Sequence, residues 1–421
     1  MFLEERRNQI LAYLTKHERA GVDYLATAFA VSKETIRSDL NELARLNLVQ
    51  RCYGGAIIVR RSLQSELIAP RSENFEVLLK RLEKQTRHQT SKQKGNKMNG
   101  KVCILGSFNV DIVAKVARFP KGGESIMAQG SALGPGGKGA NQAMAASRAG
   151  SQVYFVTKVG TDQFSQFAYD HLSSSDIHAF KLYQSDTEPT GNAIIYVSQQ
   201  NGENMIAIYP GANQTITDDE VAAIAPELTT SDVLLVQLVQ LVQLVQLVQL
   251  VQLVQLENNF SATLNVIKLA HALGKKVILN PAPYSSEILP YLDYLDVITS
   301  NETEASLLSG IDIQDFDSTK EAALKIARMG AKRVIITMGS RGALLYDGHQ
   351  FQHIPAFPAL GVDTTGAGDA FNGAFAAALA NGQSMVQAAT YASAFASLAV
   401  EREGASNMPE HQQVIARLSQ R

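Results

Sequence analysis

The chain has 421 residues, 45% of them hydrophobic, and a formal net charge of −2. This length exceeds one ordinary hydrophobic core, so we expect two domains. The two cysteines, Cys52 and Cys103, stand far apart and without metal-ligand spacing. Their placement argues against a cysteine-bound metal and favours reduced thiols in a cytoplasmic protein.

The charges are unevenly distributed along the chain. Residues 1–100 hold 18 Lys and Arg against 11 Asp and Glu, net +7, whereas residues 101–421 hold 20 against 29, net −9. A basic first part favours a polyanionic partner. Acidic residues at the very start argue against an export signal. The one long apolar tract, residues 235–256, has a Gln at every third position, so we expect no membrane span.

Three short helices and a hairpin are predicted at the start of the chain. Apolar residues recur at helical spacing over residues 4–15, 22–29 and 33–46, and Ser32 is a suitable N-cap for the third helix. Residues 48–59, with two glycines inside, predict a two-stranded wing. Together they predict a winged helix-turn-helix, whose exposed third helix would enter a DNA major groove.

This stretch resembles the head of DeoR-type bacterial repressors in two runs, Val31–Leu40 and Arg51–Ala56. The resemblance implies operator DNA as a partner, and a small domain that contacts protein is the alternative. The predicted DNA contacts lie on the third helix and the wing: Ser32, Lys33, Thr35, Arg37, Arg51 and Tyr53.

The predicted domain organisation is a DNA-binding domain over residues 1–59, a linker over 60–99 and a second domain over 100–421. The linker prediction rests on a segment rich in Lys, Arg, Gln and Ser. From residue 101 onward, β-rich runs alternate with helical patterns, which predicts an α/β fold with a mainly parallel sheet covered by helices on both faces. Residues 124–132 and 192–208 alternate differently and predict a small β lid.

Seven consecutive Leu-Val-Gln triplets occupy residues 235–255, followed by Leu256 and Glu257. A period of three fits neither a strand nor a helix, so burial of one face did not shape this tract. It has the form of a replication slippage. We expect one triplet to remain in the sheet and the other six to form a protruding insertion.

Residues 363–373 carry the strongest chemical signal. An acid, two hydroxyls and the turn Gly366-Ala367-Gly368 come directly before a long apolar helical pattern. The first amides of a helix are unpaired and the dipole is positive there, so this turn is suited to bind an anion. Asp369, at the edge of that pocket, is placed to accept a proton, and a helix N-cap is its alternative role.

Six motifs in order make residues 101 to about 415 resemble the ribokinase branch of the PfkB-type carbohydrate kinases. They are Gly106–Asp111, Gly136–Ala143, Asn280–Pro283, Asn301–Glu304, Thr337–Gly342 and Asp363–Gly373. The resemblance implies a ribokinase-like fold and transfer of the ATP γ-phosphate to a sugar hydroxyl. There is no Walker A motif, because a Gly follows Lys138.

The resemblance also implies roles for individual residues. Asp369 would be the catalytic base, with the amides of Gly366, Ala367 and Gly368 stabilising the transferring phosphoryl group. The sugar would be bound by Asn109, Asp111, Gly137, Lys138, Asn141, Glu257 and Asp369. The nucleotide would contact Asn301, Thr337, Gly339, Ser340, Gly342, Gly368 and Ser393.

Two cations are implied as cofactors beside ATP. Glu304 would position Mg²⁺ through water, and an activating K⁺ would lie at Asp363, Thr365, Ala399, Arg402 and Gly404. The sequence departs from the family in two places: the segment after Gly404 is one residue shorter, and Ser393 stands where an Asn or His usually contacts adenine.

The leading hypothesis is a cytoplasmic, homodimeric ATP:D-ribose 5-phosphotransferase with a DNA-binding regulatory head. A sugar-sensing transcription regulator, with catalysis lost through the triplet tract, is the second. Ribose and deoxyribose remain open, because both offer the same primary hydroxyl.

Overall fold

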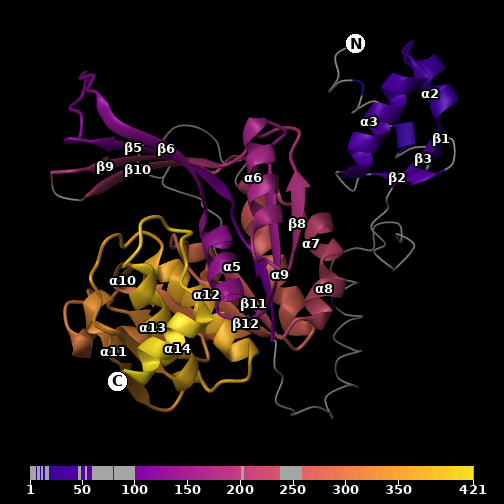
Figure 1. The fold of residues 1–421 in the computed structure, drawn as a ribbon. Helices are drawn as coiled ribbons and strands as arrows, with labels where there is room; N and C mark the ends of the chain where they lie inside the picture. Colours follow the sequence, from indigo (N-terminus) through magenta and orange to yellow (C-terminus); the bar gives the residue numbers. More distant parts are fainter. Residues whose placement is uncertain are drawn as a thin grey trace, which may run out of the picture. The chain divides into compact units, whose positions relative to one another are not determined.

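The computed structural model describes residues 6, 10, 13–14, 19–45, 49–52, 55–58, 79, 100–200, 203–237 and 258–420. They belong to two compact units, one within residues 1–72 and one within residues 73–421. Figure 1 shows the elements of both units. Leu79, inside the predicted linker, is buried among apolar residues of the larger unit.

The smaller unit has the predicted helices α2 (Val22–Ala28) and α3 (Lys33–Arg45). The wing forms as strands β2 (Val49–Cys52) and β3 (Gly55–Ile58), and a short strand β1 (Arg19–Gly21) adds to it in the order β1-β3-β2. The described residues of the predicted first helix are helical, and two of them, Ile10 and Leu14, are fully buried.

Helix α3 packs its apolar side inward and leaves its polar side exposed. Ile36 and Leu40 are fully buried in the core of this unit, and the Ser32 hydroxyl accepts the amide of Thr35 at 3.1 Å. The predicted N-cap is therefore confirmed. The exposed cations are paired, Lys33 with Asp23 at 2.9 Å and Arg37 with Glu34 at 2.8 Å. Tyr53 and the side chain of Arg51 lie outside the described residues.

The larger unit is built on a nine-stranded sheet in the order β16-β15-β14-β13-β12-β11-β4-β7-β8. The strands from β14 to β8 in this order run parallel, while β15 at one edge pairs antiparallel with both β14 and β16. Their bounds are β4 Lys101–Leu105, β7 Gln152–Val159, β8 Ala179–Gln184, β11 Val233–Gln237, β12 Lys276–Asn280, β13 Val297–Asn301, β14 Val334–Thr337, β15 Ala343–Tyr346 and β16 Phe351–Ile354.

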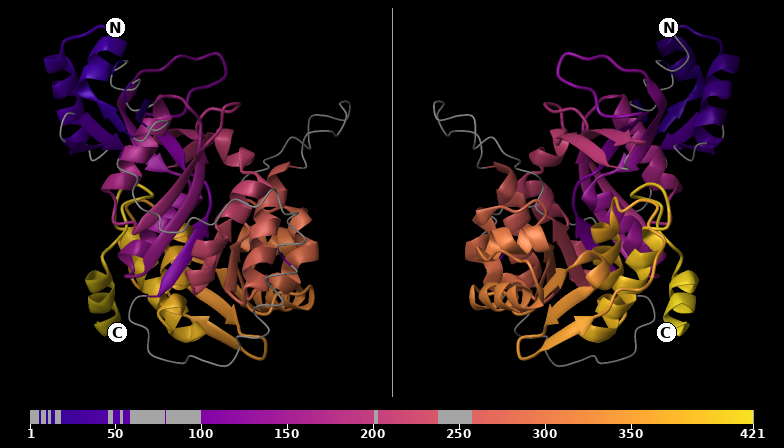
Figure 2. Two further views of the ribbon diagram at one scale, coloured as in Figure 1. Left: turned by 90° about the vertical axis from the view of Figure 1, so that its right-hand side faces the viewer. Right: turned by 90° about the vertical axis from the view of Figure 1, so that its left-hand side faces the viewer.

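Helices cover both faces of this sheet, as predicted for buried parallel strands. Successive strand residues point to opposite faces: Ile104 lies in one apolar core and Leu105 in the other. One face carries α5 (Lys138–Arg148), α6 (Gln163–Ser174), α12 (Ala367–Ala380), α13 (Met385–Ala399) and α14 (His411–Ser419). The other carries α7 (Asp218–Ala223), α8 (Ala225–Thr230), α9 (Asn258–Ala272), α10 (Glu302–Ser309), α11 (Phe316–Arg328) and the 3₁₀ helix η2 (Ser286–Tyr294). Figure 2 shows the yellow and the orange helices on opposite sides.

The predicted lid is a four-stranded sheet in the order β10-β9-β5-β6, which projects from one end of the body (Figure 1). Its strands are β5 (Asn109–Val116), β6 (Ala128–Gly136), β9 (Asn192–Ser198) and β10 (Asn204–Tyr209). The inner strand β5 was not expected. Because it begins at Asn109, the lid itself carries two of the predicted sugar-binding residues.

The structure confirms that one Leu-Val-Gln triplet lies in the sheet. Strand β11 ends with Leu235, Val236 and Gln237, all buried. The six further triplets and Glu257 lie outside the described residues. Among the described helices, none combines the length and the apolar character that a membrane crossing requires.

Candidate active site

Three neighbouring cavities share residues around Asp369. The first has a volume of about 170 Å³ and lies under the lid, the second of about 170 Å³ contains Glu304, and the third of about 640 Å³ lies between η3 (Gly339–Arg341) and α13. Asp369 borders the first two, and Gly368 borders the last two. They lie beyond the carboxyl ends of the parallel strands, the usual ligand position in such sheets.

The first cavity brings together six of the predicted sugar-binding residues, Asp369 among them. Asn109 and Asp111 come from β5, Gly137 and Lys138 from the start of α5, and Asn141 from its first turn. Apolar side chains of β9 and β10 face them. Polar groups on one side and aliphatic groups on the other suit a small polyol, which has hydroxyls and C–H faces.

Asp111 is the carboxylate that the lid contributes. Burial, and then the negative charge of Asp369, raise the pKa of Asp111 from 3.8 to about 6. Its carboxylate lies against Gly136 of the neighbouring strand, at the place where a Cβ of residue 136 would stand. Residue 136 must therefore be a glycine for Asp111 to occupy this position.

We predict that Gly136→Ala raises the KM for the sugar about tenfold or more, because the new methyl group displaces the Asp111 carboxylate. Steady-state kinetics with varied sugar measures this. Gly134→Ala on the same strand is the matched control, since a Cβ at Gly134 meets no atom within 4 Å. Equal KM values for the two variants would contradict the placement of Asp111 in the sugar site.

Asp369 is held by two amide donors from α5. It is 5% exposed, the Asn141 Nδ2 group donates to its Oδ2 at 3.1 Å, and the Gln142 Nε2 group donates to its Oδ1 at 3.0 Å. Donors on both oxygens hold the carboxylate in one orientation. A carboxylate so oriented, at the border of two cavities, is placed to accept a proton between them.

The turn before Asp369 begins helix α12. Gly366 is its N-cap and has a φ of 77°, a conformation that favours glycine. The Ala367 amide is used within the turn, since it donates to the Thr364 carbonyl at 3.2 Å. The amides of Gly366 and Gly368 make no hydrogen bond to another described residue, and both residues line the second cavity. This cavity therefore has a helix start suited to an anion.

Glu304 and Asn301 lie opposite that turn in the second cavity. They form a capping box, in which the Asn301 amide donates to Glu304 Oε2 at 3.0 Å and the Glu304 amide to Asn301 Oδ1 at 2.8 Å. Burial raises the pKa of Glu304, and Lys138 also lines the cavity.

The donor set of the second cavity fits Mg²⁺ bound together with phosphates. Within the described ranges, no cluster of three or more His, Cys, Asp or Glu residues is arranged for a metal. A nucleotide-bound Mg²⁺ needs only one or two carboxylates, because phosphates and water supply its other ligands. Glu304 meets that requirement.

The third cavity contains most of the predicted nucleotide contacts: Thr337, Gly339, Ser340, Gly342, Gly368 and Ser393. Asn301 instead lines the second cavity. The flat apolar residues that border it, Phe357, Pro358 and Phe371 among them, were not predicted. They provide the kind of wall against which a purine packs.

The predicted K⁺ residues come together only in part. The Gly404 amide donates to Asp363 Oδ2 at 3.0 Å and the Thr365 amide to Asp363 Oδ1 at 2.9 Å. Although burial opposes ionisation, these amides hold the pKa of Asp363 below its ordinary value. The Ala399 carbonyl accepts the amide of Arg402 at 3.1 Å. The Arg402 side chain turns to the Met408 carbonyl, 3.0 Å away.

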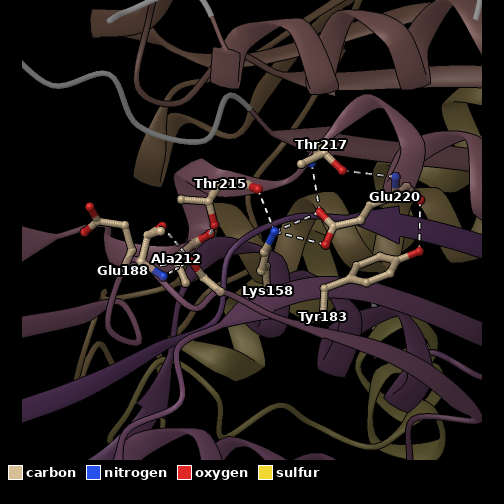
Figure 3. Close-up of polar contacts among 9 residues, drawn as sticks. Lys158, Tyr183, Glu188, Ala212, Thr215, Thr217 and Glu220 are labelled. Atoms are coloured by element: carbon tan, nitrogen blue, oxygen red, sulfur yellow. Dashed lines mark hydrogen bonds and ion pairs between the residues drawn. The ribbon is translucent and has the colours of Figure 1, made fainter.

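A buried ion pair joins Lys158 of β7 to Glu220 of α7 (Figure 3). The ammonium group of Lys158, 7% exposed, lies 2.9 Å from Glu220 and donates to the Thr215 carbonyl at 2.7 Å. Thr215 ends the 3₁₀ helix η1 (Gly211–Thr215), which carries Asn213. The Asn213 Nδ2 group donates to Asn109 Oδ1 at 2.9 Å. The ion pair thus fixes the helix that orients a predicted sugar-binding residue.

Several polar residues of the site were not predicted. Gln142 and Asn280 stand in motifs that the sequence comparison used, but neither was given a role, and Asn213 stands outside all of them. Asn372 donates to the Gly368 carbonyl at 2.8 Å. Glu257, a predicted sugar-binding residue, lies outside the described part of the chain.

Known proteins resemble both units. Residues 99–412 match the pfkB family of carbohydrate kinases, and residues 6–62 match the DeoR-like helix-turn-helix domain. The chain is 35% identical over 311 residues to a ribokinase of Staphylococcus aureus, which covers 73% of this chain and 96% of the relative. It is 33% identical over 276 residues to a deoxyribokinase of Salmonella typhi, with 65% and 84% covered. The structure of Arabidopsis thaliana ribokinase complexed with ribose and ATP matches with a TM-score of 0.64 at 30% identity, covering 76% of this chain and 99% of that one.

Proposed function

The chain belongs to the pfkB family of carbohydrate kinases, which use ATP and Mg²⁺, and it carries a DeoR-like helix-turn-helix domain; from this we propose that it phosphorylates D-ribose to D-ribose 5-phosphate and regulates transcription. The observation that carries the proposal is the position of Asp369 between a polyol-sized cavity and one suited to phosphate. The relatives named ribokinase support ribose as the substrate. The proposed domains are residues 1–59 and 100–421, joined by a linker over 60–99.

In the proposed mechanism the sugar lies in the first cavity with its primary hydroxyl at Asp369. The hydroxyl oxygen attacks the γ-phosphorus of ATP, its proton passes to Asp369, and the bond to the bridging oxygen of ADP breaks. The amides of Gly366 and Gly368 stabilise charge on the transferring group. When bound, Mg²⁺ supplies positive charge to the phosphates, and Glu304 would hold it through water.

A substrate panel tests the proposed sugar. D-Ribose, 2-deoxy-D-ribose and hexoses are compared by ATP-coupled kinetics of the full-length chain. We expect kcat/KM to be highest for ribose, because Asp111 and Asn109 offer partners for ring hydroxyls that deoxyribose has in smaller number. A higher kcat/KM for deoxyribose would overturn ribose as the substrate while leaving the kinase activity in place.

Because of the triplet tract, a second candidate function is a sugar-sensing regulator without turnover. The observation that favours it is that β11 ends at Gln237 while Glu257 stands 20 residues further along the chain. Deleting residues 238–255 joins Gln237 directly to Leu256 and Glu257. We expect the full chain to turn over and the deletion to lower the KM for the sugar. Turnover that appears only after the deletion would establish the sensor instead.

We infer an operator DNA partner for the head, since its third helix exposes Lys33 and Arg37. Both are paired with carboxylates of the head, so DNA binding must exchange these pairs for phosphate contacts. A gel shift of operator fragments that weakens with salt and in Arg37→Ala tests this. With operator DNA and ATP as its proposed partners, we propose that the protein acts in the cytoplasm.

We also propose a homodimer formed through the lid. Strand pairing places Leu133, Ile112 and Ile194 in one row on the face opposite Asp111, and Leu133 and Ile194 are 57% and 45% exposed. An exposed apolar row of this kind is typical of an interface.

K⁺ activation at Asp363 and Thr365 is a further proposal, tested by exchanging K⁺ for Na⁺ in the assay.

A further inference from the structure

We propose that Gln237, the glutamine of the first Leu-Val-Gln triplet, is a positioning residue for Asp369 and acts through Gln142. The inference rests on the proposed kinase function. On this inference, one triplet of the tract supports the base, and the other six are an insertion in the sequence after it.

The contacts form a continuous line of buried amides. Gln237 is 1% exposed and its Nε2 group donates to the Oε1 atom of Gln142 at 2.6 Å. Gln142 is fully buried, and its own Nε2 group donates to Asp369 Oδ1 at 3.0 Å and to Asn280 Oδ1 at 3.3 Å. Asn280 is in turn fixed by its donation to the Thr299 carbonyl at 2.9 Å.

The hydrogen bond that Asp369 receives from Gln142 depends on the order of donors and acceptors in this line. A glutamine side chain has one accepting and one donating end, and an ionised carboxylate only accepts. If the amide of Gln142 turned over, its carbonyl oxygen would face the Asp369 carboxylate. The donor of Gln237 prevents this, because it holds the Gln142 carbonyl oxygen on the side away from Asp369.

A second observation shows that packing alone does not account for Gln237. Its Oε1 atom is buried and has no hydrogen-bond partner in the described part of the chain. An unpaired buried acceptor destabilises the fold, and an apolar side chain of similar volume would avoid that cost. Gln237 also lines the first cavity, and its donor end is the part that contacts Gln142.

The repeat contains other glutamines, but the register of β11 places Gln237 at this position. A shift of β11 by one triplet would bring Gln240 to the position of Gln237 and would also bring Gln237 to the position of Leu234, which is fully buried among apolar residues. The register is further held by Asp232, which accepts the Lys101 amide on Oδ2 at 2.9 Å and donates its own amide to the Lys101 carbonyl at 2.9 Å.

The test compares full-length wild type, Gln237→Met, the matched control Gln240→Met, and the double variant. Methionine has a similar shape but lacks the amide. We expect Gln237→Met to lower kcat about ten- to hundredfold. The KM for the nucleotide should stay near the wild-type value, because Gln237 does not line the third cavity. Gln240→Met should behave as wild type.

Nucleotide binding checks that each variant is folded, since Gln237 does not line the third cavity. If Gln237→Met does not fold, Gln237→Asn keeps a polar group and should lower kcat in the same way. If Gln237→Met keeps the wild-type kcat but the double variant loses it, Gln240 has taken the position of Gln237 by a shift of one triplet. This result supports the proposal. If the wild type is active and the double variant keeps the wild-type kcat, the positioning role alone is overturned. An inactive wild type would overturn the kinase function and the role that rests on it.

Discussion

Asp369→Asn is expected to lower kcat for the sugar by about a hundred- to ten-thousandfold, the range that a general base contributes. The substituted amide cannot accept the hydroxyl proton. It also disturbs the site, because only one end of an asparagine accepts, whereas Asn141 and Gln142 both donate to this position. One donor would then face an NH₂ group, at a cost in stability of about 1–3 kcal/mol.

Steady-state kinetics and an equilibrium binding measurement separate the two effects. The Kd for the nucleotide should change less than kcat, because Asp369 borders the second cavity but does not line the third. A variant that binds nucleotide and sugar like wild type but turns over slowly identifies Asp369 as the base. A variant with the wild-type kcat would show that the proton leaves by another route.

Asp111→Asn is expected to stabilise the protein while abolishing efficient use of the sugar. The pKa of Asp111 is raised from 3.8 to about 6, first by burial and then by Asp369. Because the pKa is higher in the folded chain, the folded state binds this proton more tightly. The stabilising contribution of the group is complete at a pH below its ordinary value and is lost as the pH rises through about 6.

Ionised Asp111 therefore reduces stability at neutral pH, by at most about 3 kcal/mol for a shift of about two units. We expect Asp111→Asn to raise the free energy of unfolding by about 1–2 kcal/mol at pH 8 and by less at pH 5. Urea unfolding at the two pH values measures this. Equal effects at both values would contradict the raised pKa.

The same substitution should raise the KM for the sugar about a hundredfold, because a charged acceptor of ring hydroxyls is lost. In the wild type, kcat/KM for the sugar should fall as the pH drops below about 6, where Asp111 takes up a proton. A profile without this decline would remove Asp111 from the sugar site.

The sequence predicted those parts of the fold that depend on local patterns. The alternation of β-rich runs with helical patterns after residue 101 predicted the mainly parallel sheet, and the cap at Ser32 follows from short-range hydrogen bonding. Strand β5 was not predicted, because Asp111 and Lys115 interrupt its apolar pattern. Its pairing partners, such as Leu133 and Ile194, are distant in sequence.

As with the fold, the sequence predicted only part of the candidate site. Motifs located Asn109, Lys138, Asn141 and Asp369, which the fold then brings to one cavity. The polar residues behind them depend on tertiary contacts that no spacing shows. Gln142 reaches Gln237 across 95 positions of the sequence, and the triplet pattern gave no sign that its first glutamine differs from the rest.

We propose that this chain, with its triplet tract, is an active sugar kinase whose base is Asp369. The most direct measurement is the ribose-dependent formation of ADP and sugar phosphate by full-length wild type beside Asp369→Asn. We predict one ADP for each ribose 5-phosphate formed by the wild type, and a rate at least about a hundredfold lower for the variant. No ribose-dependent ADP from a folded wild type, or equal rates for the two proteins, would contradict the claim.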